Sequence, residues 1–230
     1  LFFCGGETFL WEDEGKNLRD LVLEAKAMGF YAVNVVTNGT LGLDLPEADL
    51  VLLSLDGIGP AHDRIRGEGV YDTVMGNLDR MSRSNVCLYA AINAWNLDQI
   101  QPLGELARNH PSIRCTSFNF HTPYPGTEHL VFSPEQRIEA TDAVRALIQN
   151  GYPVFNLESG LDKWLQGTWK RPCTQCIVIE EGVVSTCGRC VDHPGLCEAC
   201  GYLFAVEFTL IFQGHLPTLV QMFRTYPRYV

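Results

Sequence analysis

The sequence predicts an α/β fold, because short β-branched and aromatic segments alternate with helical patterns over about the first 157 of its 230 residues. The expected strands cover residues 1–4, 31–37, 50–55, 86–93, 113–120 and 153–157. Alternation of this regularity implies parallel strands joined by right-handed crossovers, in a doubly wound sheet or in a full or partial barrel. Ligands of such folds bind at the C-terminal ends of the strands.

Between the strands, apolar residues recur at helical spacing. Three such sets are Leu18, Leu21, Val22 and Ala25; Tyr71, Val74, Met75 and Leu78; and Ile100, Leu103 and Ala107. The clearest helix start is Ser133, which precedes Pro134 at the first helical position and Gln136, whose side chain can reach back to the cap. The alternation stops near residue 170, which predicts a core domain over residues 1–170 and a cysteine-rich appendage over residues 171–230, ending in an apolar helix or strand pair.

The composition is that of a globular protein with a sizeable core. Hydrophobic residues make up 46% and charged residues 19% of the chain, which excludes disordered and fibrous classes. With 17 basic and 27 acidic side chains the formal charge is -10, so we expect neither nucleic acid nor a membrane surface as a partner. The most apolar stretch, residues 202–212, is about half a membrane span long and contains Glu207, so no transmembrane helix is expected.

The cysteine content indicates the compartment. Six of the nine cysteines lie between Cys173 and Cys200, which suits metal or cluster ligation in a reducing cytoplasm better than a secreted disulfide framework. The chain opens on Leu1 without an initiator methionine or a signal segment, and we expect an N-terminal part to be missing.

Polar and glycine residues follow the predicted strands. They are Gly5, Gly6 and Glu7 after the first strand, Thr37, Asn38 and Gly39 after the second, Ser54, Asp56 and Gly57 at the third, Asn93 at the fourth, and His121, Thr122 and Tyr124 after the fifth. Each group taken singly is compatible with a turn or a helix cap. Their joint occurrence at successive strand ends instead favours a ligand site.

These residues resemble the radical S-adenosylmethionine (SAM) enzymes over most of residues 1–157. The resemblance is carried by Cys4-Gly5-Gly6-Glu7-Thr8, by Thr37-Asn38-Gly39, by Ser54-Leu55-Asp56-Gly57 and by His62-Asp63-Arg64-Ile65-Arg66-Gly67. It implies a partial (β/α)6 barrel that lacks its first strand. Thr8 stands where the family usually has proline, a difference that changes the stiffness of the turn more than its chemistry.

The resemblance also implies roles for the strand-end residues. Glu7, with the backbone of Gly5 and Gly6, would hold the amino group of SAM, because a carboxylate accepts hydrogen bonds from an ammonium group. Ser54 and Asp56 would contact the ribose hydroxyls. Asn93 is a further candidate contact, and Arg66 could pair with the SAM carboxylate or lie free on the surface.

One family feature is absent from the sequence. Family members supply three thiolates from a C-x3-C-x2-C loop to a [4Fe-4S] cluster that binds and cleaves SAM, and the chain contains no such spacing. In the family this loop lies upstream of the Gly-Gly-Glu strand, so we expect an N-terminally truncated enzyme. The alternative is a degenerate homologue without the cluster.

The cysteine block is the second strong signal. Three C-x-x-C units place Cys173, Cys176, Cys187, Cys190, Cys197 and Cys200 within 28 positions, as an iron–sulfur or zinc site requires. Residues 177–184 read as a hairpin with Gly182 at its turn. A hairpin followed by a cysteine resembles the start of the SPASM or twitch appendages, which implies one auxiliary [4Fe-4S] cluster held by four of the six thiolates. A zinc knuckle and a packed or disulfide-bonded role remain alternatives.

The other candidates are weaker. His121 and Tyr124 follow a strand end where a substrate would lie, so they are candidates for substrate contact or proton transfer, or else belong to the structure of the loop. Cys87 and Cys115 lie within strand segments and are expected to be buried apolar residues. For His62 and Asp63, a capping turn is favoured over a metal site.

The sequence therefore predicts a cytoplasmic radical SAM enzyme in its full-length form, acting on a peptide or small-molecule precursor and supplied by an electron donor. It would form a 5′-deoxyadenosyl radical and abstract hydrogen from its substrate. Two alternatives stay open: a non-catalytic metal-binding homologue that acts as a partner-binding module, and a zinc-ribbon protein whose barrel binds another nucleotide.

Overall fold

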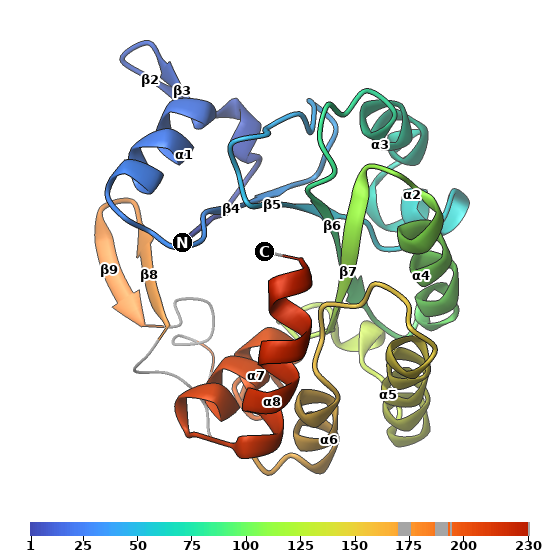
Figure 1. The fold of residues 1–230 in the computed structure, drawn as a ribbon. Coiled ribbons are helices and arrows are strands. Elements are labelled where there is room, and N and C mark those ends of the chain that lie inside the picture. The colour runs from blue at the N-terminus through green and yellow to red at the C-terminus, as the bar shows by residue number, and fades with distance from the viewer. Residues whose placement is uncertain (170–175, 187–192, 194, 230) are drawn as a thin grey trace.

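The computed structural model describes residues 1–169, 176–186, 193 and 195–229, and its centre is a five-stranded parallel sheet. The strands are β1 (Phe2–Phe3), β4 (Asn34–Thr37), β5 (Leu50–Ser54), β6 (Val86–Ile92) and β7 (Ile113–Phe120). Their order in the sheet is β1-β4-β5-β6-β7, which is also their order along the chain (Figure 1). The predicted parallel α/β fold is therefore confirmed.

Helices cover the outer face of the sheet. They are α1 (Leu18–Ala27), α2 (Pro60–Arg66), α3 (Val70–Leu78), α4 (Ile100–Asn109), α5 (Pro134–Gln149) and α6 (Glu158–Gln166). Buried side chains from four of them, Val22, Val74, Leu103 and Val144, share one hydrophobic core with Val51 and Leu88 of the sheet. The predicted helical sets lie in α1, α3 and α4, and Ser133 caps α5 in a capping box with Gln136, as predicted.

The inner face of the sheet carries a second, smaller core. Leu50 and Leu52 of β5, Cys87 of β6 and Cys115 of β7 are buried there, packed against Phe155 and Tyr229. Tyr229 lies at the C-terminal end of the chain, after α7 (Leu203–Phe212), α8 (Leu216–Thr225) and the 3-10 turn η4 (Tyr226–Arg228). Figure 1 shows that this end of the chain reaches the side of the sheet opposite to α1–α5. Cys87 and Cys115 are buried free thiols, as expected.

The sixth predicted strand, over residues 153–157, is wrong as a regular strand. One parallel bridge joins Val154 to Thr116 of β7. Beyond this bridge, the side chain of Asn156 instead of its main chain forms the hydrogen bonds to β7. Asn156 Oδ1 accepts from the Phe118 main-chain nitrogen at 2.7 Å, and its Nδ2 donates to the Phe118 carbonyl at 3.1 Å. A side-chain amide therefore replaces a peptide group beside β7.

Other expectations differ in extent. The first strand is shorter than predicted and covers Phe2–Phe3. The helices α2 and α6 and the small hairpin of β2 (Glu12–Asp13) and β3 (Lys16–Asn17) are additional to the predicted elements. After residue 170, β8 (Ile177–Glu180) and β9 (Val183–Thr186) form the predicted hairpin around Gly182. Of the two alternatives for the C-terminal segment, the helical one is confirmed, with two helices over Leu203–Phe212 and Leu216–Thr225.

No single helix within the described ranges has the length and hydropathy of a membrane span, although α7 and Leu216–Arg228, bent by 115°, reach that length and composition together.

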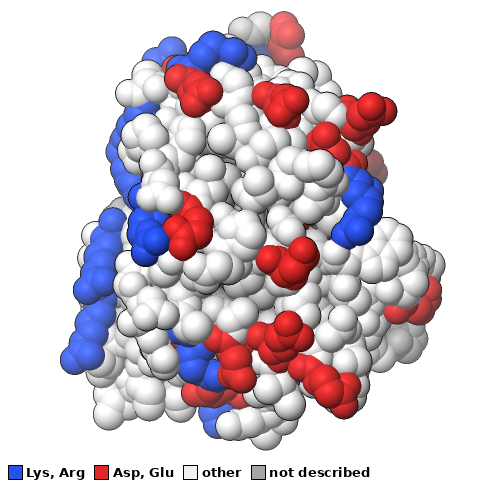
Figure 2. Space-filling model, turned by 90° about the vertical axis from the view of Figure 1, so that its right-hand side faces the viewer, with Lys and Arg blue, Asp and Glu red and all other residues white. Residues whose placement is uncertain are grey.

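Figure 2 shows the face that lies on the right in Figure 1. Acidic side chains are spread across this face, and basic ones lie mostly near its margins.

Candidate functional site

Glu7 sits just beyond β1 and is bound by the end of β4. Its Oε1 accepts hydrogen bonds from Thr37 Oγ1 at 2.6 Å and from the Phe9 main-chain nitrogen at 3.1 Å, and its Oε2 accepts from the Asn38 main-chain nitrogen at 2.8 Å. The carboxylate thus joins the loops after β1 and β4 through three of the chain's own donors. About one acceptor position remains for an external donor, on Oε2, because the two oxygens of a carboxylate offer about four positions and three are used.

Gly5 and Gly6 precede Glu7 in backbone conformations that favour glycine. Their φ angles are +108° and +52°, and an added Cβ on either would meet no atom within 4 Å. Both residues are exposed. The loop therefore offers open main chain that a ligand can approach closely.

Asp56 occupies the end of β5 and is almost fully buried, with 1% of its surface exposed. Its Oδ1 accepts from the Ala91 main-chain nitrogen of β6 at 2.8 Å, and its Oδ2 accepts from Arg66 Nε at 2.6 Å. Arg66 keeps 38% of its side chain exposed, and its two terminal nitrogens make no hydrogen bond to the described part of the chain. The pair therefore presents a fixed guanidinium group at the sheet edge.

Ser54 and Asn93 differ in how far their side chains are engaged. Ser54 is half-buried at the end of β5, and its side chain makes no hydrogen bond to the residues that the structure describes. Asn93, after β6, is buried and stabilises its own turn, where its Oδ1 accepts from the Trp95 main-chain nitrogen at 2.8 Å. Ser54 is therefore available to a ligand, and Asn93 serves the loop.

The structure places these residues at one edge of the sheet. Glu7 is tied to the end of β4, β4 pairs with β5 up to Thr37 and Leu53, and Asp56 is tied to β6 through Ala91. Four successive strand ends thus contribute to a single polar edge. On the inner face next to this edge, Ser54 and Tyr89 are half-buried and Ala91 is exposed. Farther from the edge, the inner face is covered by Phe155 and Tyr229.

His121 and Tyr124 belong to the loop after β7. His121 Nε2 lies 3.0 Å from Thr127 Oγ1, and burial lowers the pKa of this histidine below its ordinary value. The Tyr124 hydroxyl lies 3.4 Å from the Tyr202 hydroxyl, just before α7. His121 thus contacts a residue of its own loop, and Tyr124 contacts the residue that precedes α7.

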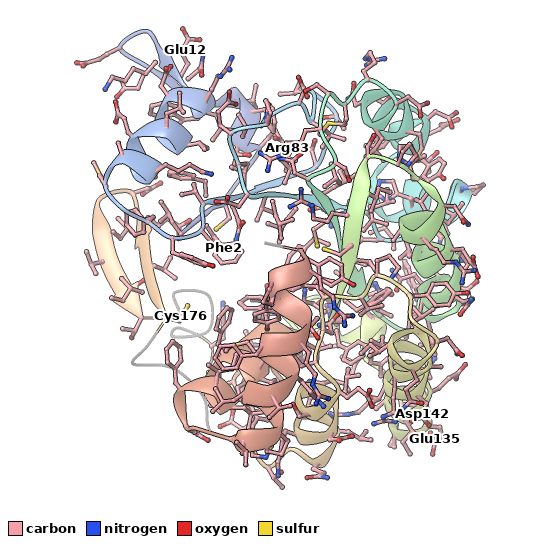
Figure 3. All side chains as sticks on the ribbon, in the orientation of Figure 1. Phe2, Glu12, Arg83, Glu135, Asp142 and Cys176 are labelled. Atoms are coloured by element: carbon pink, nitrogen blue, oxygen red, sulfur yellow. The ribbon has the colours of Figure 1, made fainter. Side chains whose placement is uncertain are left out.

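Three of the six proposed metal ligands lie in the described ranges. Cys176, which is labelled in Figure 3, is exposed and lies directly before β8 at the base of the hairpin. Cys197 and Cys200 form a turn in which the Cys200 nitrogen donates to the Cys197 carbonyl at 3.3 Å. Cys173, Cys187 and Cys190 lie outside the described residues. Within the described ranges, no group of three or more His, Cys, Asp or Glu is placed to hold a metal.

The Cys197–Cys200 turn is held against the sheet by the residues that follow it. The Phe120 nitrogen donates to the Gly201 carbonyl at 2.8 Å, and the Gly201 nitrogen donates to Thr122 Oγ1 at 2.9 Å. Trp164 Nε1 also donates to the Cys200 carbonyl at 2.9 Å. The segment around Gly201 therefore meets the sheet at the C-terminal end of β7, on the same edge as the polar residues.

For His62 the sequence favoured a capping turn over a metal site, and for Glu207 it predicted no functional role. His62 is fully buried in α2, where its Nδ1 accepts from the Asp56 main-chain nitrogen at 3.1 Å. Asp63 beside it forms the expected capping turn, accepting from the nitrogens of Gly69 and Tyr71. A possible signal for His62 was its four-residue spacing from Arg66, which puts both on one helical face.

No family model matches the chain, and no curated protein is significantly similar to it in sequence.

Proposed function

We propose that the chain belongs to a cytoplasmic radical SAM enzyme with a partial (β/α)6 barrel. The observation that carries this proposal is the polar edge, where Glu7, Ser54 and the Asp56–Arg66 pair stand on successive strand ends in the order that the family resemblance requires. The agreement of strand order with chain order supports a barrel-like winding, because a doubly wound sheet reverses its order at one point.

In this proposal each residue of the polar edge contacts a different group of SAM. Gly5 and Gly6 offer open main chain, and Glu7 accepts from the SAM amino group while it keeps its internal donors. Arg66 binds the carboxylate through its terminal nitrogens, and Ser54 donates to a ribose hydroxyl. Asp56 orients Arg66 rather than touching the ribose, since both of its oxygens are occupied and it is buried.

Two iron–sulfur sites complete the proposal. An auxiliary [4Fe-4S] cluster would be held by four of Cys173, Cys176, Cys187, Cys190, Cys197 and Cys200. The cluster that cleaves SAM would need three thiolates of a C-x3-C-x2-C loop, and the sequence contains no such motif. When bound, SAM and its cluster supply the radical chemistry, while the protein positions the ligand and excludes water. A peptide or small precursor would be the substrate, and an electron donor a second partner.

The non-catalytic alternative also has a supporting observation. Glu7 already accepts three hydrogen bonds from its own chain, which is sufficient for a structural role in joining two loops. Under this alternative the protein is a metal-binding module, and the polar edge has no affinity for SAM.

Calorimetric titration with S-adenosylhomocysteine, which needs no cluster, separates the two. We expect binding, and we expect Ser54→Ala to weaken it about threefold to tenfold, because one hydrogen bond contributes roughly 0.5–1.5 kcal/mol. Ser84→Ala, an exposed serine before β6, is the matched control and should leave the affinity unchanged. Absence of binding by the wild type would favour the non-catalytic alternative.

Metal analysis tests the appendage separately. Anaerobically reconstituted protein should be brown, with about four iron and four sulfide per chain. Cys187→Ser, at the cysteine that directly follows the hairpin in sequence, should reduce that content, whereas Cys4→Ser, an exposed cysteine outside the block, should not. A colourless protein with about one zinc per chain would support the zinc-ribbon alternative.

A further inference from the structure

Two side chains of α2 hold Asp56 from one side. His62 and Arg66 are one helical turn apart, and both reach the end of β5. His62 Nδ1 accepts from the Asp56 main-chain nitrogen at 3.1 Å, while Arg66 Nε donates to the Asp56 carboxylate at 2.6 Å. Asn96 Nδ2 adds a bond to the Asp56 carbonyl at 2.7 Å. The main chain and the side chain of Asp56 are therefore both fixed.

The donor on Asp56 determines the protonation of His62. Because a main-chain N–H points at Nδ1, this ring nitrogen carries no proton, and the neutral ring bears its proton on Nε2. Nε2 is buried without a hydrogen-bond partner in the described ranges. Burial is the main cause that lowers the pKa of His62 below its ordinary value.

Packing around this contact leaves little freedom. A Cβ added to Gly57 would lie 2.9 Å from the Ala61 Cβ and 3.2 Å from the His62 main-chain nitrogen, so α2 approaches the strand end as closely as the backbone allows. The ring of Tyr71 from α3 stands edge-on to His62, with centroids 6.3 Å apart. A shift of the His62 ring would thus move Asp56.

We propose that His62 is a positioning residue, which in its neutral form fixes Asp56 and thereby orients the Arg66 guanidinium toward the carboxylate of the bound ligand. The proposal rests on the function proposed above and assigns to the same site a residue that does not touch the ligand. It deepens the role of Arg66, because an arginine fork recognises a carboxylate well only when its orientation is fixed.

Protonation of His62 disrupts this arrangement. With a proton on Nδ1, two donors would face each other at the Asp56 contact, and the hydrogen bond would be lost. The charged and titratable groups around the ring are the Asp56 carboxylate, Arg66 and Asp63 of α2, and Tyr71 of α3. Since the pKa of His62 is lowered, ligand affinity is intact at neutral pH and is lost as the pH falls below the ordinary histidine value of about 6.5.

Calorimetric titration of S-adenosylhomocysteine into the wild type, His62→Asn and His62→Leu tests the proposal. Asparagine can offer its Oδ1 where Nδ1 stood, whereas leucine fills space without an acceptor. We expect His62→Leu to weaken binding about tenfold or more at pH 7.5, and His62→Asn to stay within about threefold of the wild type. The drop in affinity below pH 6.5 should disappear in His62→Asn, because no imidazole remains to be protonated.

His110→Leu is the matched control. His110 Nδ1 also accepts from a main-chain nitrogen, that of Ser112, but after α4 and before the N-terminal end of β7. The His110→Leu variant should bind S-adenosylhomocysteine with the affinity of the wild type. Failure of the wild type to bind contradicts the proposed function. Binding that is equal in the wild type and His62→Leu contradicts the positioning role alone. If His62→Leu does not fold, the folded His62→Asn variant decides. Weak binding by His62→Asn overturns the positioning role. Wild-type affinity that stays constant as the pH falls below 6.5 supports it.

Discussion

Thr37 shows how one buried hydroxyl organises the polar edge. Its Oγ1 donates to Glu7 Oε1 at 2.6 Å and accepts from the Gly39 main-chain nitrogen at 3.0 Å. Gly39 also packs tightly, since an added Cβ would lie 2.5 Å from Leu53 Cδ1. The Thr-Asn-Gly sequence is therefore explained by packing and by hydrogen bonding within the chain, before any ligand is considered.

Thr37→Val should lower the free energy of unfolding by about 1–3 kcal/mol, because it leaves the buried Gly39 nitrogen without an acceptor and removes a donor from Glu7. Urea denaturation followed by circular dichroism measures the change. Thr37→Ser keeps the hydroxyl and should recover most of the stability. Equal stabilities for the valine variant and the wild type would show that these two bonds contribute little.

At the scale of elements, the sequence predicted those features that depend on residues close to one another along the chain. The capping box at Ser133 and Gln136 was readable because both partners lie within one helical turn. The hairpin around Gly182 was readable because its turn needs positive φ, which Glu181 and Gly182 both adopt. In contrast, Asn156 replaces a strand by bonding to Phe118, a contact between distant segments that no periodicity reports.

The same limit applies to the candidate site. The strand-end positions of Glu7, Ser54 and Asp56 followed from the alternation of elements, because the C-terminal ends of parallel strands share one edge. Their partners did not follow from the sequence. That Asp56 is buried under α2, and that Arg66 points to it, depends on how close Gly57 lets the helix approach.

The segment after the cysteine turn depends on glycine at one position. A Cβ added to Gly201 would lie 2.0 Å from the Phe120 carbonyl oxygen, which belongs to the backbone of β7. Gly201→Ala should therefore displace the turn and increase hydrogen exchange at residues 197–203, measured by mass spectrometry. Gly76→Ala, in α3, meets nothing closer than 3.7 Å and is the matched control. Unchanged exchange in Gly201→Ala would contradict the close packing.

At the scale of the whole molecule, the C-terminal end of the chain covers the inner face of the sheet. Tyr226 stacks on Phe155 with ring centroids 4.5 Å apart, and Arg114 Nη1 donates to the Tyr229 carbonyl at 3.0 Å. The Tyr226 hydroxyl donates to Glu207 Oε2 of α7 at 2.9 Å. This bond anchors the segment that covers Cys87 and Cys115.

Tyr226→Phe should accordingly loosen the cover while keeping the stacked ring. We expect faster alkylation of Cys87 and Cys115 by iodoacetamide in the folded protein, located by peptide mass spectrometry. Tyr31→Phe changes a tyrosine that is 96% exposed and lies outside this core, and it should react like the wild type. Equal rates in all three proteins would show that the Tyr226–Glu207 bond does not anchor this segment.

Glu207 gives the fold a dependence on pH. Its Oε1 accepts from the Leu157 main-chain nitrogen at 2.9 Å, yet complete burial raises the pKa of Glu207 to about 7. The folded state therefore binds the proton more tightly than the unfolded chain, whose glutamate titrates near the ordinary value of 4.5. The resulting stability is fully present below about pH 4.5 and is lost as the pH rises to about 7.

Glu207→Gln removes this titration while keeping the shape of the side chain and an acceptor for Leu157. Relative to the variant, the wild type should lose about 3 kcal/mol of unfolding free energy between pH 4.5 and pH 8, since each pKa unit corresponds to roughly 1.4 kcal/mol. Urea denaturation of both proteins at intervals of one pH unit measures the difference and cancels the groups they share. Parallel curves across this range would mean that Glu207 keeps an ordinary pKa, and that water or a neighbouring charge reaches the carboxylate.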